Sequence, residues 1–269
     1  MRPLCFAVYV YEDYTKFIPF YIYSILNSYP EYYVKVFVRE KLSESENKCL
    51  DFIRERLSSN FEVKENFYPD FQLSDSTMRV LRFLIPFDEF KEFDNVYIGD
   101  VDFLIVKEYV SILQGHLNHC ENIELPYSNE IRTGTKRLSG LHFFKVKEYY
   151  KKMDRIIEHY LNNREKLSNL MAKLKSNERF LYHIIKEGIG FGKLNHAKKY
   201  RPHHGLHLSC DIEGFFENRK DSSKERYNHL KSKLKEYLCD TLFLDMLDVV
   251  PVKKIIELSY ELQKYPDEQ

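Results

Sequence analysis

The segment that most constrains the fold is residues 95–106, NVYIGDVDFLIV. Apolar and small residues on both sides of Asp100 and Asp102 are typical of a buried β-strand, so two carboxylates interrupt one core element. Residues i and i+2 of a strand point to the same face, which would bring the carboxylates together. Two carboxylates that lie close together in a core raise the pKa of one of them or need a cation between them. The cation that carboxylate oxygens bind best is a hard divalent ion. Gly99 permits a bend before the pair. The alternative is a strand end with both aspartates solvated.

The remaining segments predict an α/β fold with a mostly parallel central sheet. Strand-like runs occupy Cys5–Val10 and Tyr33–Val38, and residues 17–26 between them resemble a buried helix, with Pro19 tolerated in its first turn. Strand, helix and strand in this order form a βαβ unit, which builds parallel sheets. Further elements are expected at 43–57 (a helix with Ser43 and Glu46 as a capping box), 61–63 (a weak strand), 76–90 (a helix interrupted at Pro86), 138–146 (a strand) and 147–187 (two helices).

The C-terminal part of the chain has a different composition. The glycines from Gly188 to Gly192 indicate a helix end and a turn, and residues 193–204 are locally basic. From about residue 219 the sequence is charged and helix-forming without a strand pattern, which predicts a helical extension. We therefore divide the chain into a catalytic domain over 1–215 and a C-terminal helical extension over 216–269. The lysines and arginines of 219–235 could contact anionic lipid or phosphate, although a solvated helix face is the default explanation.

Composition excludes several classes of protein. The chain has 269 residues with 41 Lys and Arg against 41 Asp and Glu, and a net charge of zero argues against a nucleic-acid-binding protein. The five cysteines are scattered without a C-x-x-C pair, so neither a disulfide framework nor a ribbon-type zinc site is indicated. The apolar start is too short for a signal peptide, and no run approaches the roughly 20 apolar residues of a spanning helix. We expect a cytoplasmic protein.

Five motifs, the acidic pair among them, occur in order along the chain. They are VYVYEDY at 8–14, Arg82 and Pro86 upstream of VYIGDVD at 96–102, LSGLHFF at 138–144, NERFL at 177–181 and HGLH at 204–207. With this order and spacing the sequence resembles the GT-A glycosyltransferases over about residues 5–209. It is most similar to the family 8 type of retaining galactosyl- and glucosyltransferases. The resemblance implies a Rossmann-like GT-A domain that binds a nucleotide-sugar donor through Mn²⁺ or Mg²⁺.

The resemblance also implies roles for individual residues. The donor-binding residues would be Tyr9, Tyr11, Asp13, Tyr14, Arg82, Asp100, Val101, Ser139, Gly140 and Gly205. Tyrosine rings suit stacking on uracil or contact with ribose, and a guanidinium suits a charge-assisted contact with the diphosphate. The plainer alternatives are core packing for any one tyrosine and a surface ion pair with Glu89 for Arg82.

Three neighbouring histidines, His203, His204 and His207, offer a nitrogen ligand for the metal. The metal site would be Asp100, Asp102 and His207, with His204 as the other choice, because two aspartates leave positions for one protein nitrogen and the diphosphate. One alternative is a solvated basic loop that contacts phosphate without metal. Another is a zinc site that includes the next cysteine, although its spacing matches no common zinc module.

Asn177 and Glu178 are the candidate catalytic residues. Glu178 begins an otherwise apolar helical segment, so its carboxylate would lie near a helix N-terminus. In an inverting enzyme it could be the general base that takes the proton of the acceptor hydroxyl. In a retaining enzyme it would lie beneath the sugar and support front-face departure of the diphosphate. The alternative is an acid that stabilises only the helix dipole. The family has Asp-Gln at this position, so the stereochemical outcome stays open.

These features together predict a metal-dependent glycosyltransferase. It would move a sugar from a UDP-sugar to a hydroxyl of a saccharide or glycolipid acceptor, as in bacterial surface polysaccharide synthesis. The metal and Arg82 would stabilise the charge that develops on the leaving diphosphate. The enzyme would work in the cytoplasm, with contact to the inner face of the membrane through the C-terminal tail. The rivals are a nucleotidyltransferase or phosphohydrolase, and a non-catalytic nucleotide-sugar-binding protein.

Overall fold

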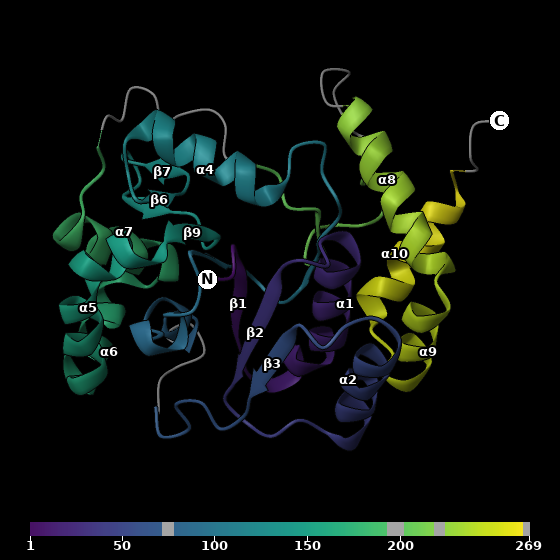
Figure 1. The fold of residues 1–269 in the computed structure, drawn as a ribbon, viewed down its shortest axis with the longest axis horizontal. Coiled ribbons are helices and arrows are strands. Elements are labelled where there is room, and N and C mark those ends of the chain that lie inside the picture. The colour runs from purple at the N-terminus through teal and green to yellow at the C-terminus, as the bar shows by residue number, and fades with distance from the viewer. Residues whose placement is uncertain (72–77, 193–201, 218–223, 266–269) are drawn as a thin grey trace.

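The computed structural model describes residues 1–71, 78–192, 202–217 and 224–265 as an α/β fold (Figure 1). Within these residues a sheet of six strands lies between two groups of helices. The strands of this sheet are β1 (Cys5–Val10), β2 (Tyr33–Val38), β3 (Phe61–Lys64), β4 (Asn95–Ile98), β6 (Tyr127–Ser128) and β9 (His142–Lys145). The helices are α1 (Ile18–Ser28), α2 (Glu44–Arg56), α4 (Ile112–Ile123), α5 (Val146–Asn162), α6 (Arg164–Leu174), α7 (Asn177–Gly188), α8 (Lys224–Cys239), α9 (Thr241–Val249) and α10 (Lys253–Gln263).

The sheet is mixed and mostly parallel, as the βαβ pattern predicted. Its strand order is β3-β2-β1-β4-β9-β6, and β3, β2, β1 and β4 are parallel to one another. β9 runs antiparallel to both β4 and β6. The carboxyl ends of the parallel strands therefore share one edge of the sheet, and the start of β9 lies at the same edge. In open α/β sheets ligands bind at this edge.

Both faces of the sheet are buried, and alternate residues of β1 contribute to different cores. Phe6 and Val8 pack in the cluster that contains α1, α2 and the C-terminal helices, whereas Cys5 and Ala7 pack with α5, α6 and α7. This period of two follows from strand geometry. All residues of β1 are buried, which explains why its sequence is continuously apolar.

Helix α2 begins with the predicted capping box. The backbone N–H of Glu46 donates to the Ser43 hydroxyl at 3.2 Å, and the backbone N–H of Ser43 donates to the Glu46 carboxylate at 2.7 Å. These bonds satisfy backbone donors that the first turn of a helix leaves open, and a cap of this kind contributes about 1 kcal/mol.

The predicted C-terminal helices are present and pack on the sheet domain. Phe243 of α9 lies edge-on to Phe20 and Tyr23 of α1, with both centroid distances 5.2 Å. The hydroxyl of Tyr237 in α8 donates to the carbonyl of Ile105 at 2.5 Å. Figure 1 shows α8, α9 and α10 on the side of the molecule where α1 and α2 lie. The extension therefore shares a hydrophobic core with the domain, and the boundary at residue 215 stays a prediction.

The prediction of one strand over residues 95–106 was wrong. β4 ends at Ile98, residues 99–102 form a turn, and β5 (Phe103–Leu104) pairs antiparallel with β10 (Leu206–His207) in a separate sheet. A Cβ on Gly99 would lie 2.9 Å from the Tyr21 hydroxyl, so the close packing at the bend favours glycine. The two aspartates consequently do not share one strand face.

Two further helix predictions need correction. Met78 is helical, but residues 79–90 form turns with the short 3₁₀ segments η2 (Leu81–Phe83) and η3 (Phe87–Glu89) instead of a helix. Residues 76–77 lie outside the described part. Pro86 lacks an N–H and restricts the residue before it, which explains the break. Residues 147–187 contain three helices rather than two, because Lys175 adopts a left-handed conformation with φ 53° after α6.

The predicted strand over 138–146 is also divided. β8 (Arg137–Leu138) pairs with β7 (Ile131–Arg132), residues 139–141 form a loop, and β9 follows. The basic run at 193–201 and the start of the lysine-rich tail at 218–223 lie outside the described residues. Among the helices that the structure describes, none is both long and apolar enough to cross a membrane.

His142 on β9 makes stability depend on pH. It is fully buried, and burial lowers the pKa of its imidazole from 6.5 to about 3. Between these values the unfolded chain binds a proton that the folded chain does not. The free energy of unfolding should therefore fall as the pH falls through this window, by up to about 1.4 kcal/mol per pH unit from this residue.

We expect His142→Gln to flatten this slope in urea denaturation between about pH 6.5 and about pH 4.5. The matched control is His159→Gln on α5, because His159 is exposed. This control should keep the wild-type slope. An equally steep slope in His142→Gln would contradict the assignment.

Candidate active site

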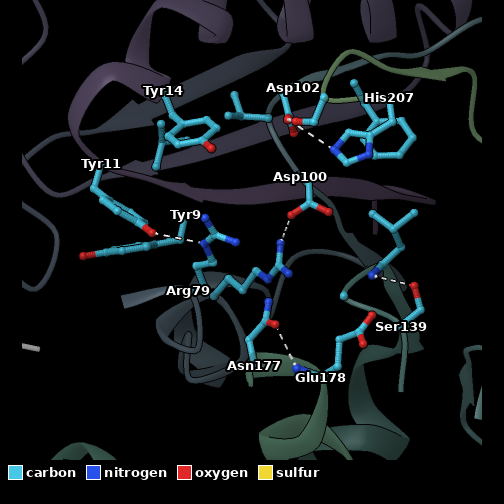
Figure 2. A pocket seen from close by; sticks show the side chains of 17 residues that line it. Tyr9, Tyr11, Tyr14, Arg79, Asp100, Asp102, Ser139, Asn177, Glu178 and His207 are labelled. Carbon is cyan, nitrogen blue, oxygen red and sulfur yellow. Dashed lines mark hydrogen bonds and ion pairs between the residues drawn. The ribbon is translucent and has the colours of Figure 1, made fainter. Parts of the chain in front are cut away.

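The edge of the sheet at the ends of β1 and β4 holds a pocket of about 620 Å³ (Figure 2). Its walls come from six regions that are far apart in the sequence. The lining residues are Tyr9, Val10, Tyr11, Tyr14, Arg79, Arg82, Asp100, Val101, Asp102, Phe103, Ser139, Gly140, Leu141, Asn177, Glu178, His207 and Ser209. Most of the predicted site residues are therefore together in one place.

Three tyrosines at the end of β1 form an aromatic wall. The ring centroids of Tyr9 and Tyr11 are 6.3 Å apart, and those of Tyr11 and Tyr14 are 6.4 Å apart. Tyr14 lies in the 3₁₀ segment η1 (Glu12–Phe17) and is 38% exposed, so part of its ring is open to solvent. Rings with a polar tip suit contact with a flat, partly polar ligand such as a nucleobase.

Arg82 holds the first carboxylate of the acidic turn. Its Nη1 donates to the backbone carbonyl of Gly99 at 3.1 Å and to Oδ1 of Asp100. The Arg82 side chain is only 7% exposed and that of Asp100 is 33% exposed, so the pair forms part of the pocket floor. Glu89 pairs with two lysines and not with Arg82, so the surface ion pair that the sequence allowed is absent from the described residues.

The second carboxylate of the turn faces His207. Nε2 of His207 lies 3.2 Å from Oδ2 of Asp102, and the hydroxyl of Ser209 donates to the same oxygen. Burial alone would raise the pKa of Asp102, but the bonds from His207 and Ser209 lower it. Burial alone would lower the pKa of His207, but the neighbouring carboxylate raises it. The β5–β10 pairing sets this contact, because Phe103 is opposite His207 and their rings stack at 4.5 Å.

A buried asparagine shapes the loop that carries Ser139 and Gly140. Nδ2 of Asn129 donates to the carbonyls of Ser139 and Leu141, both at 3.0 Å. Its Oδ1 accepts the backbone N–H of Ser139 at 2.7 Å. A Cβ on Gly140 would collide with Nη2 of Arg82, so the loop packs directly on the buried arginine.

Asn177 and Glu178 lie in the first turn of α7. The Ser176 hydroxyl caps this helix by accepting from a backbone N–H of the first turn. The backbone N–H of Glu178 donates to Oδ1 of Asn177 at 2.9 Å, and the Glu178 carboxylate lies 3.7 Å from Nη1 of Arg137. The positive end of the helix dipole stabilises a carboxylate at this position. Glu178 therefore lies near a helix N-terminus, as expected, and faces the pocket.

The structure separates the two candidate histidine ligands. His207 lines the pocket, whereas His204 is 3% exposed and does not. Nε2 of His204 lies 2.7 Å from Nε2 of His116, and its ring stacks on Tyr97 with a centroid distance of 4.7 Å. His204 thus belongs to a buried polar cluster behind the site.

Gly205 and Asp13 also lie outside this pocket. Gly205 has φ +91°, and a Cβ there would collide with the carbonyl oxygen of Leu104. Close packing against β5 therefore explains the glycine. Asp13 lines a neighbouring pocket of about 440 Å³, which shares Tyr14, Asp102 and Ser209 with the first.

Five lining residues were not among the predicted site residues, namely Val10, Arg79, Phe103, Leu141 and Ser209. Arg79 precedes Arg82 by three residues, and its Nε donates to the Tyr11 hydroxyl at 3.4 Å. Two arginines three residues apart in a tight turn lie on the same face of that turn. Their spacing in the sequence therefore indicated that Arg79 could reach the same site as Arg82. Phe103 and Ser209 gave no such signal, because they reach the site only through the pairing of β5 with β10.

The side chains of the acidic turn and His207 provide some, but not all, of the ligands that a divalent ion needs. Among the residues that the structure describes, no three His, Cys, Asp or Glu side chains gather closely enough to hold a metal. Asp102 and His207 nevertheless offer an oxygen and a nitrogen 3.2 Å apart, and Oδ2 of Asp100 is not the atom bonded to Arg82. Carboxylates suit Mg²⁺ and Mn²⁺, and neutral imidazole is a common ligand. Asp102 and His207 would hold such an ion, with Asp100 as the nearest further carboxylate.

Gly140→Ala should displace Arg82 from the acidic turn, because the new methyl group would collide with Nη2 of Arg82. Overpacking of this kind costs about 1–3 kcal/mol, which urea denaturation would measure. Gly134→Ala is the matched control, since a Cβ there meets nothing within 4 Å. We expect it to be neutral or slightly stabilising. Equal stabilities of the two variants would contradict this packing.

Comparison with known proteins gives no sequence-level family assignment. No protein-family model matches the chain, and no curated protein matches it. Solved structures that match are GT-A glycosyltransferases. An active-site mutant of LgtC has 12% identity and a TM-score of 0.41, over 58% of this chain and 64% of that chain.

Two other matches span almost the whole of this chain. The apo bifunctional glycosyltransferase WbbM has 13% identity and a TM-score of 0.45, over 97% of this chain and 52% of that one. The apo glycosyltransferase GlyE of Streptococcus pneumoniae has 9% identity and a TM-score of 0.44, over 98% of this chain and 65% of that one. The chain thus spans about half to two thirds of the length of these structures. With TM-scores below 0.5, nothing about its activity follows from the matches.

Proposed function

We propose that this chain is a metal-dependent glycosyltransferase that moves a sugar from a nucleotide-sugar to a hydroxyl group. The observation that carries the proposal is the convergence of separated motifs on one pocket. The tyrosines after β1, Arg82, the acidic turn, the loop before β9, the start of α7 and His207 all line it. A chance resemblance in sequence has no reason to bring these segments to one site at the ligand-binding edge of an α/β sheet.

The pocket has an order that suits such a donor. Tyr11 and Glu178 lie on opposite sides of it, with Asp100 between them (Figure 2). A nucleotide-sugar consists of nucleoside, diphosphate and sugar in line. Placing the nucleoside against the tyrosines puts the sugar near Asn177 and Glu178.

The chemistry would rest on electrostatic stabilisation. A bound Mn²⁺ or Mg²⁺ would supply positive charge at the leaving diphosphate, where such stabilisation is usually the largest catalytic term. Asp102 and His207 would hold the ion, as their 3.2 Å contact suggests. Glu178 would take the proton of the acceptor hydroxyl if the enzyme inverts, or support the departing diphosphate if it retains.

The donor we propose is a UDP-sugar, and the acceptor is a saccharide or glycolipid, as in bacterial surface polysaccharide synthesis. The protein would work in the cytoplasm and contact the inner face of the membrane through the lysine-rich C-terminal helices. We propose no nucleic-acid partner, since the net charge is zero.

Wild-type protein should bind UDP in the presence of Mn²⁺, and Asp102→Asn should weaken that binding at least about 10-fold, which isothermal titration calorimetry would show. The reason is loss of an anionic ligand from the proposed metal site. Asp88→Asn is the control, because the Asp88 side chain is 83% exposed and does not line the pocket. Failure of wild type to bind UDP, GDP or CMP with Mn²⁺ would overturn the proposed function.

Glu178→Gln should lower the rate of sugar transfer by about 10²–10⁴-fold while the affinity for UDP stays unchanged, because the carboxylate would act only on the reacting groups. Glu187→Gln on the same helix is the matched control, since the Glu187 side chain is 55% exposed at the far end of α7. Product formation from a UDP-sugar and an acceptor would be measured. Near-wild-type transfer by Glu178→Gln would show that Glu178 takes no part in the reaction. Nucleotide turnover without an acceptor would favour a phosphohydrolase.

A further inference from the structure

Among the described residues, each charged side chain that lines the pocket lies near a group of opposite charge or a histidine, with one exception. Asp100 binds Arg82, Asp102 binds His207, and Glu178 lies 3.7 Å from Arg137. Arg79 pairs with no carboxylate in the part of the chain that the structure describes, and its recorded bond is from Nε to the Tyr11 hydroxyl at 3.4 Å. The pocket therefore carries one positive charge without an acidic partner.

Arg82 is poorly placed to bind a ligand anion. Its side chain is 7% exposed, and Nη1 already donates to the carbonyl of Gly99 and to Asp100. Gly140 packs against Nη2. Moving Arg82 to a ligand would leave a buried carbonyl and a carboxylate without their donor, which is costly. Arg82 is thus a positioning residue for the acidic turn.

Arg79 has the opposite properties. It is exposed, and it lines the pocket between the tyrosines and Asp100 (Figure 2). The bond from Nε to Tyr11 orients the guanidinium and leaves both terminal nitrogens for a ligand. Two terminal N–H groups in a planar fork match two oxygens of a phosphate group.

We propose that Arg79, and not Arg82, binds the diphosphate of the donor. This inference rests on the proposed function, because it takes the ligand to be a nucleoside diphosphate derivative. The diphosphate lies between nucleoside and sugar, and Arg79 lies between the aromatic wall and the acidic turn in the same order. The Arg79 guanidinium neutralises the charge of one phosphate on the side of the diphosphate that faces the tyrosines. Asp102 and His207 lie on the other side.

The test compares UDP with uridine, titrated calorimetrically with Mn²⁺ into wild type, Arg79→Gln and Arg79→Lys. We expect the affinity of Arg79→Gln for UDP to fall at least about 10-fold, with a smaller fall for Arg79→Lys, which keeps the charge but loses the fork. The affinity for uridine, which has no phosphate, should not change. Tyr11→Phe removes the orienting hydroxyl and should weaken UDP binding by a smaller factor than Arg79→Gln.

Arg155→Gln serves as the control for loss of an exposed arginine, since Arg155 lies on α5 away from the pocket. Thermal melting of each variant checks that the fold is kept. Unchanged UDP affinity in Arg79→Gln would overturn the inference, and so would an equal loss of UDP and uridine, which would place Arg79 at the base. A wild type that binds no UDP would instead contradict the proposed function itself.

Discussion

The buried contact between Arg82 and Asp100 fixes the geometry on which the site depends. The guanidinium binds the carboxylate and the carbonyl of Gly99 together, so β4 ends there and the chain turns. Removing Asp100 would leave the buried Arg82 guanidinium without its compensating charge, which destabilises the fold even though the Asp100 side chain is 33% exposed. The turn then directs Asp102 toward His207 rather than beside Asp100. Each aspartate thereby has its own partner, Arg82 for Asp100 and His207 for Asp102, and the two carboxylates do not have to share one site.

A second constraint brings the C-terminal part of the chain to the same place. β10 pairs with β5 immediately after the acidic turn, and Gly205 allows this approach because its φ of +91° and its missing Cβ avoid the carbonyl of Leu104. The pairing aligns His207 with the pocket and directs His204 into the buried cluster with His116. Two histidines three residues apart thus have different environments, which argues for His207 as the residue that acts on a ligand.

The first strands and helices of the sheet domain were predictable from the sequence, because the patterns that indicate them are local. The bounds of β1 and β2 and the capping box of α2 follow from apolar runs and from the spacing of Ser43 and Glu46. The acidic turn was not predictable in shape, since it depends on a contact with Arg82 from another segment. Asn129 was missed for the same reason, because hydrogen bonds across the chain define its role. The convergence of the motifs on one pocket could only be expected by resemblance.

The central claim is that this pocket holds a nucleotide with a divalent ion. A crystal structure of the protein with UDP and Mn²⁺, with data collected at a wavelength where manganese scatters anomalously, tests it most directly. We expect the anomalous peak beside Asp102 and His207, the uracil against Tyr11, and the diphosphate between Arg79 and the metal. Nucleotide density elsewhere on the molecule, or a manganese peak remote from the acidic turn, would contradict the claim.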